Sequence, residues 1–321
     1  MKSRFLVPVV LGLSLSPIVR AQSTDSLRVS ADHYRIYTSS GADAAWEDVV
    51  AAMTHVDVVL IGENHDDPVA HHIEAATLQA AIDQGWAVGA SLEMFSRDVQ
   101  GVVDEYLSGV ITESHFRSSA RPWGNYETDY RPFVEAAREA GMPVIAANAP
   151  RRYVNRVSRL GPKSLDALSD EALRWVAPIP YAQASPAYKA EWDALMREAM
   201  GDSAPAESDT SATRHGGPMD NVLSAQSLWD ATMAWSIVEH LTRHPGSRVV
   251  HIAGSFHVKN GTGIAEHVER YRPGTRQLLI VAVPAEDIST FDPEEHAGLG
   301  DFVILGDEGL PRTMQVGQGT R

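Results

Sequence analysis

The stretch Asp57-Val-Val-Leu-Ile-Gly-Glu-Asn-His65 decides the fold that this sequence predicts. Residues 58–61 are a continuous apolar run rich in β-branched side chains, which is typical of a strand buried on both faces of a parallel sheet. Gly62 ends the run, and Pro68 begins a pattern typical of a helix. The polar residues at 63–65 therefore lie between a strand and a helix, where open α/β sheets form their binding and catalytic sites. The structural alternative is a helix cap that happens to contain a histidine.

The same pattern recurs along the chain. Apolar strands predicted at 87–92, 143–147 and 248–253 are followed by Glu93, by Asn148 and by a segment ending in His257. Two more strands are predicted at 278–283 and 302–305. The helices predicted between the strands cover residues 69–84, 98–107, 133–140, 153–160, 219–240 and 263–271. This alternation predicts an α/β fold with a doubly wound, mainly parallel sheet and helices on both faces.

One region departs from the alternation. Residues 178–218 contain five prolines and several aromatic and methionine side chains, and the part from Gly201 to Thr213 is almost wholly small and polar. We interpret this region as an inserted helical lid with a helix at 187–199. Residues 22–321 are then a single α/β domain that carries the lid at about 178–218.

The first 21 residues have the pattern of a secretory signal peptide. Lys2 and Arg4 precede an apolar run, and Val19-Arg-Ala21 has small residues at the positions that signal peptidase requires. The apolar run is too short to span a membrane. Since the chain has no cysteine, a lipid anchor, disulfides and thiolate metal sites are excluded. We therefore expect a periplasmic or secreted protein without a membrane anchor.

The charge of the chain argues against two kinds of partner. The formal net charge is −15, and it becomes −18 when Lys2, Arg4 and Arg20 leave with the signal peptide. Nucleic acids and anionic lipid surfaces need clustered positive charge on the protein. We therefore expect a small-molecule ligand and no nucleic-acid partner.

The polar residues that follow the strands are candidate catalytic residues. The carboxyl ends of parallel strands meet at one edge of a sheet, so Glu63, His65, Glu93 and His257 are expected to converge there. His65, Glu93 and His257 could bind a divalent metal ion, or a histidine could act as a general base without metal. Each of these residues alone could be a structural group with a hydrogen bond. His71 and His72 are expected on a solvated face of the helix.

Several motifs in the same order resemble those of one known family, the ChaN-type haem-binding uptake proteins. The motifs are Gly62-Glu-Asn-His65, Ser91-Leu-Glu-Met-Phe95, Tyr130-Arg-Pro132, Ala147-Asn-Ala-Pro-Arg151, the stretch 225–234, and Ala253-Gly-Ser-Phe-His-Val-Lys-Asn-Gly261. The resemblance extends over residues 45–284. It implies an exported α/β protein that binds haem, often at a homodimer interface under a helical lid, and serves iron acquisition.

The resemblance leaves the haem site open. Members of the family are commonly lipoproteins, which this chain does not match, and His215-Gly-Gly217 stands where the family often has His-Cys-Gly. Tyrosine and histidine can bind haem iron, so Tyr130, Tyr181 and His215 are candidate ligands, with Arg131 in the same motif as Tyr130.

Two functions follow from these observations. The first is haem binding beneath an aromatic lid, with haem as the cofactor or ligand. The second is hydrolysis at the Glu63, His65, Glu93 and His257 cluster, with or without a divalent metal ion, as in the superfamily's Tiki metalloproteases and erythromycin esterases.

Overall fold

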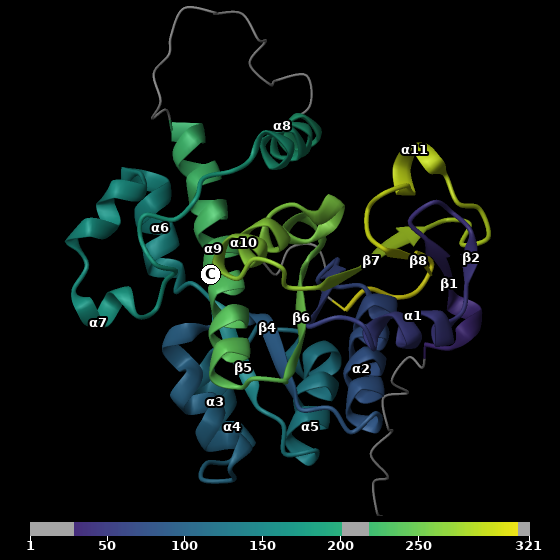
Figure 1. Ribbon diagram of the computed structural model, residues 1–321, viewed down its shortest axis with the longest axis horizontal. Coiled ribbons are helices and arrows are strands. Elements are labelled where there is room, and N and C mark those ends of the chain that lie inside the picture. Colours follow the sequence, from purple (N-terminus) through teal and green to yellow (C-terminus); the bar gives the residue numbers. More distant parts are fainter. Residues whose placement is uncertain (1–28, 201–217, 314–321) are drawn as a thin grey trace, which may run out of the picture.

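The computed structural model describes residues 29–200 and 218–313. An eight-stranded sheet with the order β2-β1-β8-β7-β3-β6-β4-β5 forms its centre (Figure 1). Strands β3 to β8 are parallel, and β1 pairs antiparallel with both β2 and β8. The predicted α/β fold with a mainly parallel, doubly wound sheet is confirmed.

The strands lie close to their predicted positions. They are β1 (Tyr34–Thr38), β2 (Asp43–Ala44), β3 (Val58–Glu63), β4 (Val88–Ser96), β5 (Val144–Asn148), β6 (Arg248–Gly254), β7 (Gln277–Ala285) and β8 (Phe302–Asp307). The strand expected after residue 87 continues to Ser96, so Glu93 lies within β4 and not after it.

The helices also follow the predicted order. They are α1 (Trp46–Met53), α2 (Pro68–Asp83), α3 (Gln100–Leu107), α4 (Glu113–Ala120), α5 (Arg131–Glu139), α6 (Arg151–Leu160), α7 (Asp170–Leu173), α8 (Pro186–Met200), α9 (Pro218–Arg243), α10 (Ile264–Tyr271) and α11 (Pro293–His296). Residues 121–132, expected to be an irregular loop, contain a π-helical turn at Tyr126–Tyr130 that buries both tyrosines. None of the helices in the described ranges is both long and apolar enough to cross a membrane.

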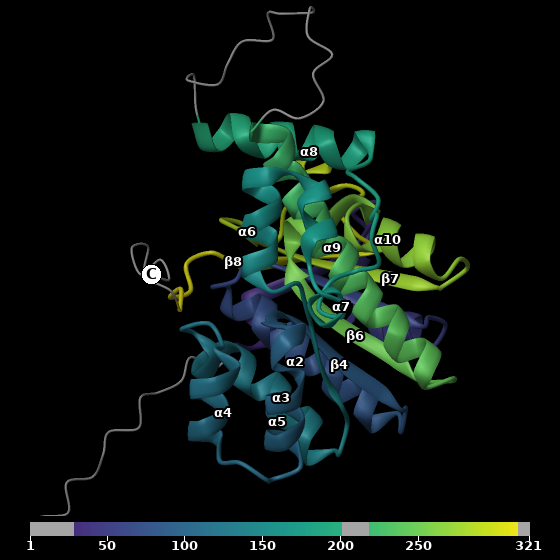
Figure 2. The ribbon, with the colours of Figure 1, turned by 90° about the vertical axis from the view of Figure 1, so that its left-hand side faces the viewer.

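Helices cover both faces of the sheet (Figure 2). Successive side chains of a strand point to opposite faces. Accordingly Val59 and Ile61 of β3 pack in a core with residues of α2, α3, α4 and α5. Val58 and Leu60 pack in a second core with residues of α9 and α10. Strand β3 is therefore buried on both faces, and its carboxyl end is held rigidly at the centre of the sheet.

Helix α8 occupies part of the region expected to form a lid. Its side chains Tyr188 and Trp192 are buried against Phe256, with ring centroids 4.9 and 6.0 Å apart. Glu191 of the same helix accepts a hydrogen bond from Thr262. Helix α8 thus packs on the segment that follows β6. The expected signal peptide at 1–21, the stretch from Gly201 to Thr213 and His215 lie outside the described residues.

Candidate functional site

The structure places the four candidate catalytic residues at the carboxyl ends of three adjacent strands. Glu63 is the last residue of β3, and His65 follows two positions later. Glu93 lies near the end of β4, and His257 ends the 3-10 turn that directly follows β6. Because β6 lies between β3 and β4 in the sheet, side chains from these three strand ends can face one another.

Glu63 and His65 form the first histidine–carboxylate pair. The Nδ1 atom of His65 lies 2.8 Å from Oε1 of Glu63, and the Tyr130 hydroxyl donates a 2.6 Å hydrogen bond to the same oxygen. Burial alone would raise the pKa of Glu63, but the hydrogen bond with His65 and the charge of His71 outweigh it and lower the pKa to about 2. Glu63 is therefore a buried carboxylate that orients the ring of His65.

His257 and Asp230 form the second pair. Asp230 is fully buried on α9, and its Oδ1 lies 2.5 Å from Nδ1 of His257. Burial would lower the pKa of His257, but the charges of Asp230 and Glu93 outweigh it and raise the pKa to about 9. The contact also fixes the ring orientation and leaves Nε2 pointing toward the strand ends.

Glu93 stands between the two pairs. Its Oε2 accepts a 2.8 Å hydrogen bond from the backbone N–H of Gly254, and its Oε1 lies 3.8 Å from Nε2 of His257. A Cβ atom on Gly254 would lie 3.1 Å from Nε2 of His65 and 3.7 Å from Oε2 of Glu93. The missing side chain of Gly254 thus lets His65 approach Glu93 closely. Each histidine has one carboxylate behind it and faces Glu93.

His65 is the member of the cluster that is most open to solvent, with 36% of its side chain exposed. Trp123 packs against it edge to face, with ring centroids 4.5 Å apart. Burial would lower the pKa of His65, but the hydrogen bond with Glu63 and the charge of Glu93 raise it. A histidine that is oriented by a carboxylate and reachable from solvent has the geometry of a general acid or base.

A second polar network lies beneath the first. His71 and Glu74 of α2 are buried, so the expectation of a solvated face is wrong for His71. The Nδ1 atom of His71 lies 3.0 Å from Oε2 of Glu74 and 3.1 Å from Oε2 of Glu63. Burial and the charge of Glu63 raise the pKa of Glu74 to about 8. Burial would lower the pKa of His71, but the charges of the surrounding acids raise it to about 10.

The grouping that suits a metal ion differs from the predicted one. Among the described residues, only Glu63, His71 and Glu74 form a group of three whose ligand atoms all lie within 4.8 Å of one another. The set expected from the sequence, His65, Glu93 and His257, does not form such a group. Helix α2 therefore supplies ligand candidates that were assigned to solvent.

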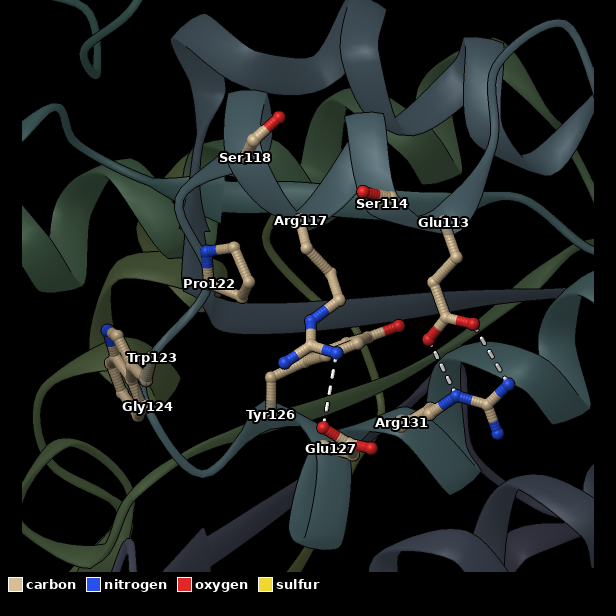
Figure 3. A pocket seen from close by; sticks show the side chains of 10 residues that line it. All are labelled: Glu113, Ser114, Arg117, Ser118, Pro122, Trp123, Gly124, Tyr126, Glu127 and Arg131. Atoms are coloured by element: carbon tan, nitrogen blue, oxygen red, sulfur yellow. Dashed lines mark hydrogen bonds and ion pairs between the residues drawn. The ribbon is translucent and has the colours of Figure 1, made fainter.

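The candidate haem residues occupy different environments. Tyr181 is buried, and its hydroxyl donates to the carbonyl of Ser224, while the hydroxyl of Tyr130 is held by Glu63. Arg131 forms a 2.7 Å ion pair with Glu113. This pair lines an open pocket of about 860 Å³ that Trp123 also borders (Figure 3). His215 lies outside the described residues.

The sequence interpretation missed Asp230 and the burial of His71. Asp230 had a detectable signal, because it lies one position after Trp229 and four after Gln226 in the apolar pattern of the longest helix. A charged residue next to such a stripe indicates a buried partner. His71 and Glu74 had no comparable signal, because α2 is covered on more than one side.

Comparison with known proteins identifies the class. Residues 49–268 match the model of a family described as haem-binding uptake, Tiki superfamily, ChaN. The fold and this match define an α/β protein of the Tiki superfamily. Since the match covers more than half of the chain, the chain belongs to the ChaN family of haem-binding uptake proteins. No curated protein matches it.

Solved structures share the fold at low sequence identity. ChaN of Campylobacter jejuni, described by its cofacial haem binding, has a TM-score of 0.62 and 16% identity over 86% of this chain and 98% of that one. The type III effector HopBA1 gives 0.45 and 13% over 81% and 91%. The erythromycin esterase EreC in its open conformation gives 0.44 and 9% over 78% and 77%.

Proposed function

We propose that this protein is an exported haem-binding protein that acts in haem or iron uptake. The observation that carries the proposal is the family match over residues 49–268, because the model is that of haem-binding uptake proteins. The similarity to ChaN of Campylobacter jejuni supports the fold in which such binding would take place. Export rests on the signal pattern of residues 1–21.

One end of the molecule offers an apolar surface for the proposed ligand. Leu160, Leu195 and Met219 are exposed large apolar side chains on the ends of α6, α8 and α9. Figures 1 and 2 place these helix ends on the same side of the sheet. Exposed apolar patches mark ligand or protein contacts. We infer that this end meets a porphyrin face or a second copy of the chain, with α8 as the described part of the lid.

A haemin titration of the mature protein tests the proposal. We expect a Soret band that shifts and saturates, and that changes in one of the variants Tyr130→Phe, Tyr181→Phe and His215→Ala. Tyr271→Phe, a tyrosine on α10, is the control and should leave the band unchanged. A linear titration with the spectrum of free haemin would exclude haem binding.

A second function, hydrolysis, is favoured by one observation in particular. Two histidines, each backed by a buried carboxylate, face Glu93 at the strand ends. Haem binding does not require this arrangement, whereas general acid–base catalysis does. Hydrolysis of a generic ester should fall in His65→Ala, His257→Ala and Glu93→Gln and persist in His72→Ala. A wild-type rate equal to that of buffer would remove this second function.

A further inference from the structure

The buried group Glu63, His71 and Glu74, here called the α2 acid–histidine cluster, has no role in either proposed function beyond the contact of Glu63 with His65. Glu63 is 2% exposed, His71 6% and Glu74 0%. Two carboxylates and one imidazole thus converge without water access. Such a concentration of polar groups in a core is costly unless the groups share a counter-charge.

The spacing within the cluster fits a metal ion. The ligand atoms of Glu63, His71 and Glu74 lie within 4.8 Å of one another, and the two carboxylate contacts of His71 Nδ1 are 3.0 and 3.1 Å. With bond lengths of about 2.1 Å, neighbouring ligands of one ion lie about 3 Å apart. All three ligand atoms could therefore contact one ion with little movement.

The groups around the cluster resemble the outer partners of a metal site. The Nε2 atom of His71 lies 3.3 Å from the carbonyl oxygen of His65 and 3.4 Å from Oδ2 of Asp129. A histidine that binds metal through one ring nitrogen usually donates from the other to a carbonyl or carboxylate. Glu63 is likewise held at its other oxygen by Tyr130 and His65. The candidate ligands are thus oriented from outside.

Two oxygens in the cluster lack hydrogen-bond partners. Oε2 of Glu63 and Oε1 of Glu74 are buried without a hydrogen bond. Buried carboxylate oxygens are normally satisfied, so their free lone pairs point to a cation. The charge balance agrees, because protons on His71 and Glu74 accompany the charge of Glu63 near neutral pH. A divalent ion that replaces both protons leaves the net charge of the cluster unchanged.

We propose that Glu63, His71 and Glu74 form a binding site for one divalent cation of hard or borderline character, such as Mn²⁺ or Zn²⁺. Two carboxylates and one imidazole are the ligand types that such ions accept in the absence of thiolates. The ion would join β3 to α2 and, through Glu63, hold the ring of His65. This inference does not depend on haem binding or on hydrolysis.

Metal binding by the full mature chain tests the site. The protein is treated with chelator, loaded with Zn²⁺ or with Mn²⁺, freed of excess ion and analysed for metal content and affinity. His240 and His244 on α9 stack with ring centroids 4.6 Å apart and could bind Zn²⁺ adventitiously, so all measurements use a His244→Gln background. We expect about one ion per chain and a raised melting temperature in its presence.

Variants locate the ion. Glu74→Gln keeps the shape of the side chain and should weaken binding by about 100-fold or more, since loss of even an outer partner costs about 10–100-fold. Asp129→Asn should weaken it by about 10-fold and decides the question if Glu74→Gln does not fold. His72→Gln, on the same helix beside His71, is the matched control and should bind as the parent does.

The site is disproved if the parent retains no ion, or if Glu74→Gln and Asp129→Asn both bind as tightly as the parent. It is also disproved if Glu93→Gln abolishes binding while Glu74→Gln leaves it intact, because the ion would then belong to the strand-end cluster. A spectrum of bound Co²⁺ that changes in His71→Asn but not in His72→Gln would support direct ligation by His71.

Discussion

Asp230→Asn is the change that examines the charge of His257 most directly. In the wild type, buried Asp230 contacts Nδ1 of His257 and, with Glu93, raises the pKa of the imidazole. Asparagine keeps the shape and can still accept a hydrogen bond, but it removes the negative charge. The pKa of His257 should therefore fall in the variant.

The size of the effect follows from the pKa. A rise from 6.5 to about 9, at 1.36 kcal/mol per pKa unit, corresponds to at most about 3 kcal/mol of stability. Because the folded state keeps a proton that the unfolded chain releases, this contribution is complete below pH 6.5. It is lost as the pH rises from 6.5 to about 9.

Urea unfolding at pH 6, 7, 8 and 9 measures the effect. The difference in unfolding free energy between wild type and Asp230→Asn should be largest at pH 6 and shrink by up to about 3 kcal/mol at pH 9. Glu139→Gln, at the exposed end of α5, is the control and should show no such trend. A difference that stays constant from pH 6 to 9 would show that His257 is not held in its charged form.

Two further predictions concern stability. Glu63→Gln should lower the unfolding free energy at pH 7 by up to about 3 kcal/mol, because the pKa of Glu63 lies at about 2 instead of 4.5. The wild-type contribution is present above pH 4.5 and lost as the pH falls toward 2, so urea curves of the two proteins should converge in acid; parallel curves would contradict this. Phe116→Ala should cost about 3–5 kcal/mol, since the ring is fully buried and stacked on Tyr106, and a loss below 1 kcal/mol in the same assay would show a loosely packed core.

The sheet could be predicted because its signals are local. Apolar runs such as 58–61 occur only where a strand is covered on both faces, and the core residues of β3 divide between the two faces as the alternation requires. The positions of Glu63, His65 and His257 at one edge follow from the parallel order of the strands. A sequence pattern therefore leads to the candidate site without knowledge of the contacts.

The partners of these residues could not be predicted in the same way. Asp230 reaches His257 only because α9 crosses the strand ends, which no spacing within either segment encodes. His71 is buried because α5 and the π-helical turn at 126–130 cover the side of α2 that faces away from the sheet. The π-helical turn itself has no periodic signature, so Trp123 and Tyr130 could not be placed beside His65 from the sequence.

Native mass spectrometry of the mature protein after incubation with haemin tests the central claim most directly. Haem binding predicts a discrete haem adduct of fixed stoichiometry that survives an excess of haemin, on a monomer or on a dimer. A graded series of adducts that grows with the haemin concentration and has no preferred stoichiometry would contradict the claim.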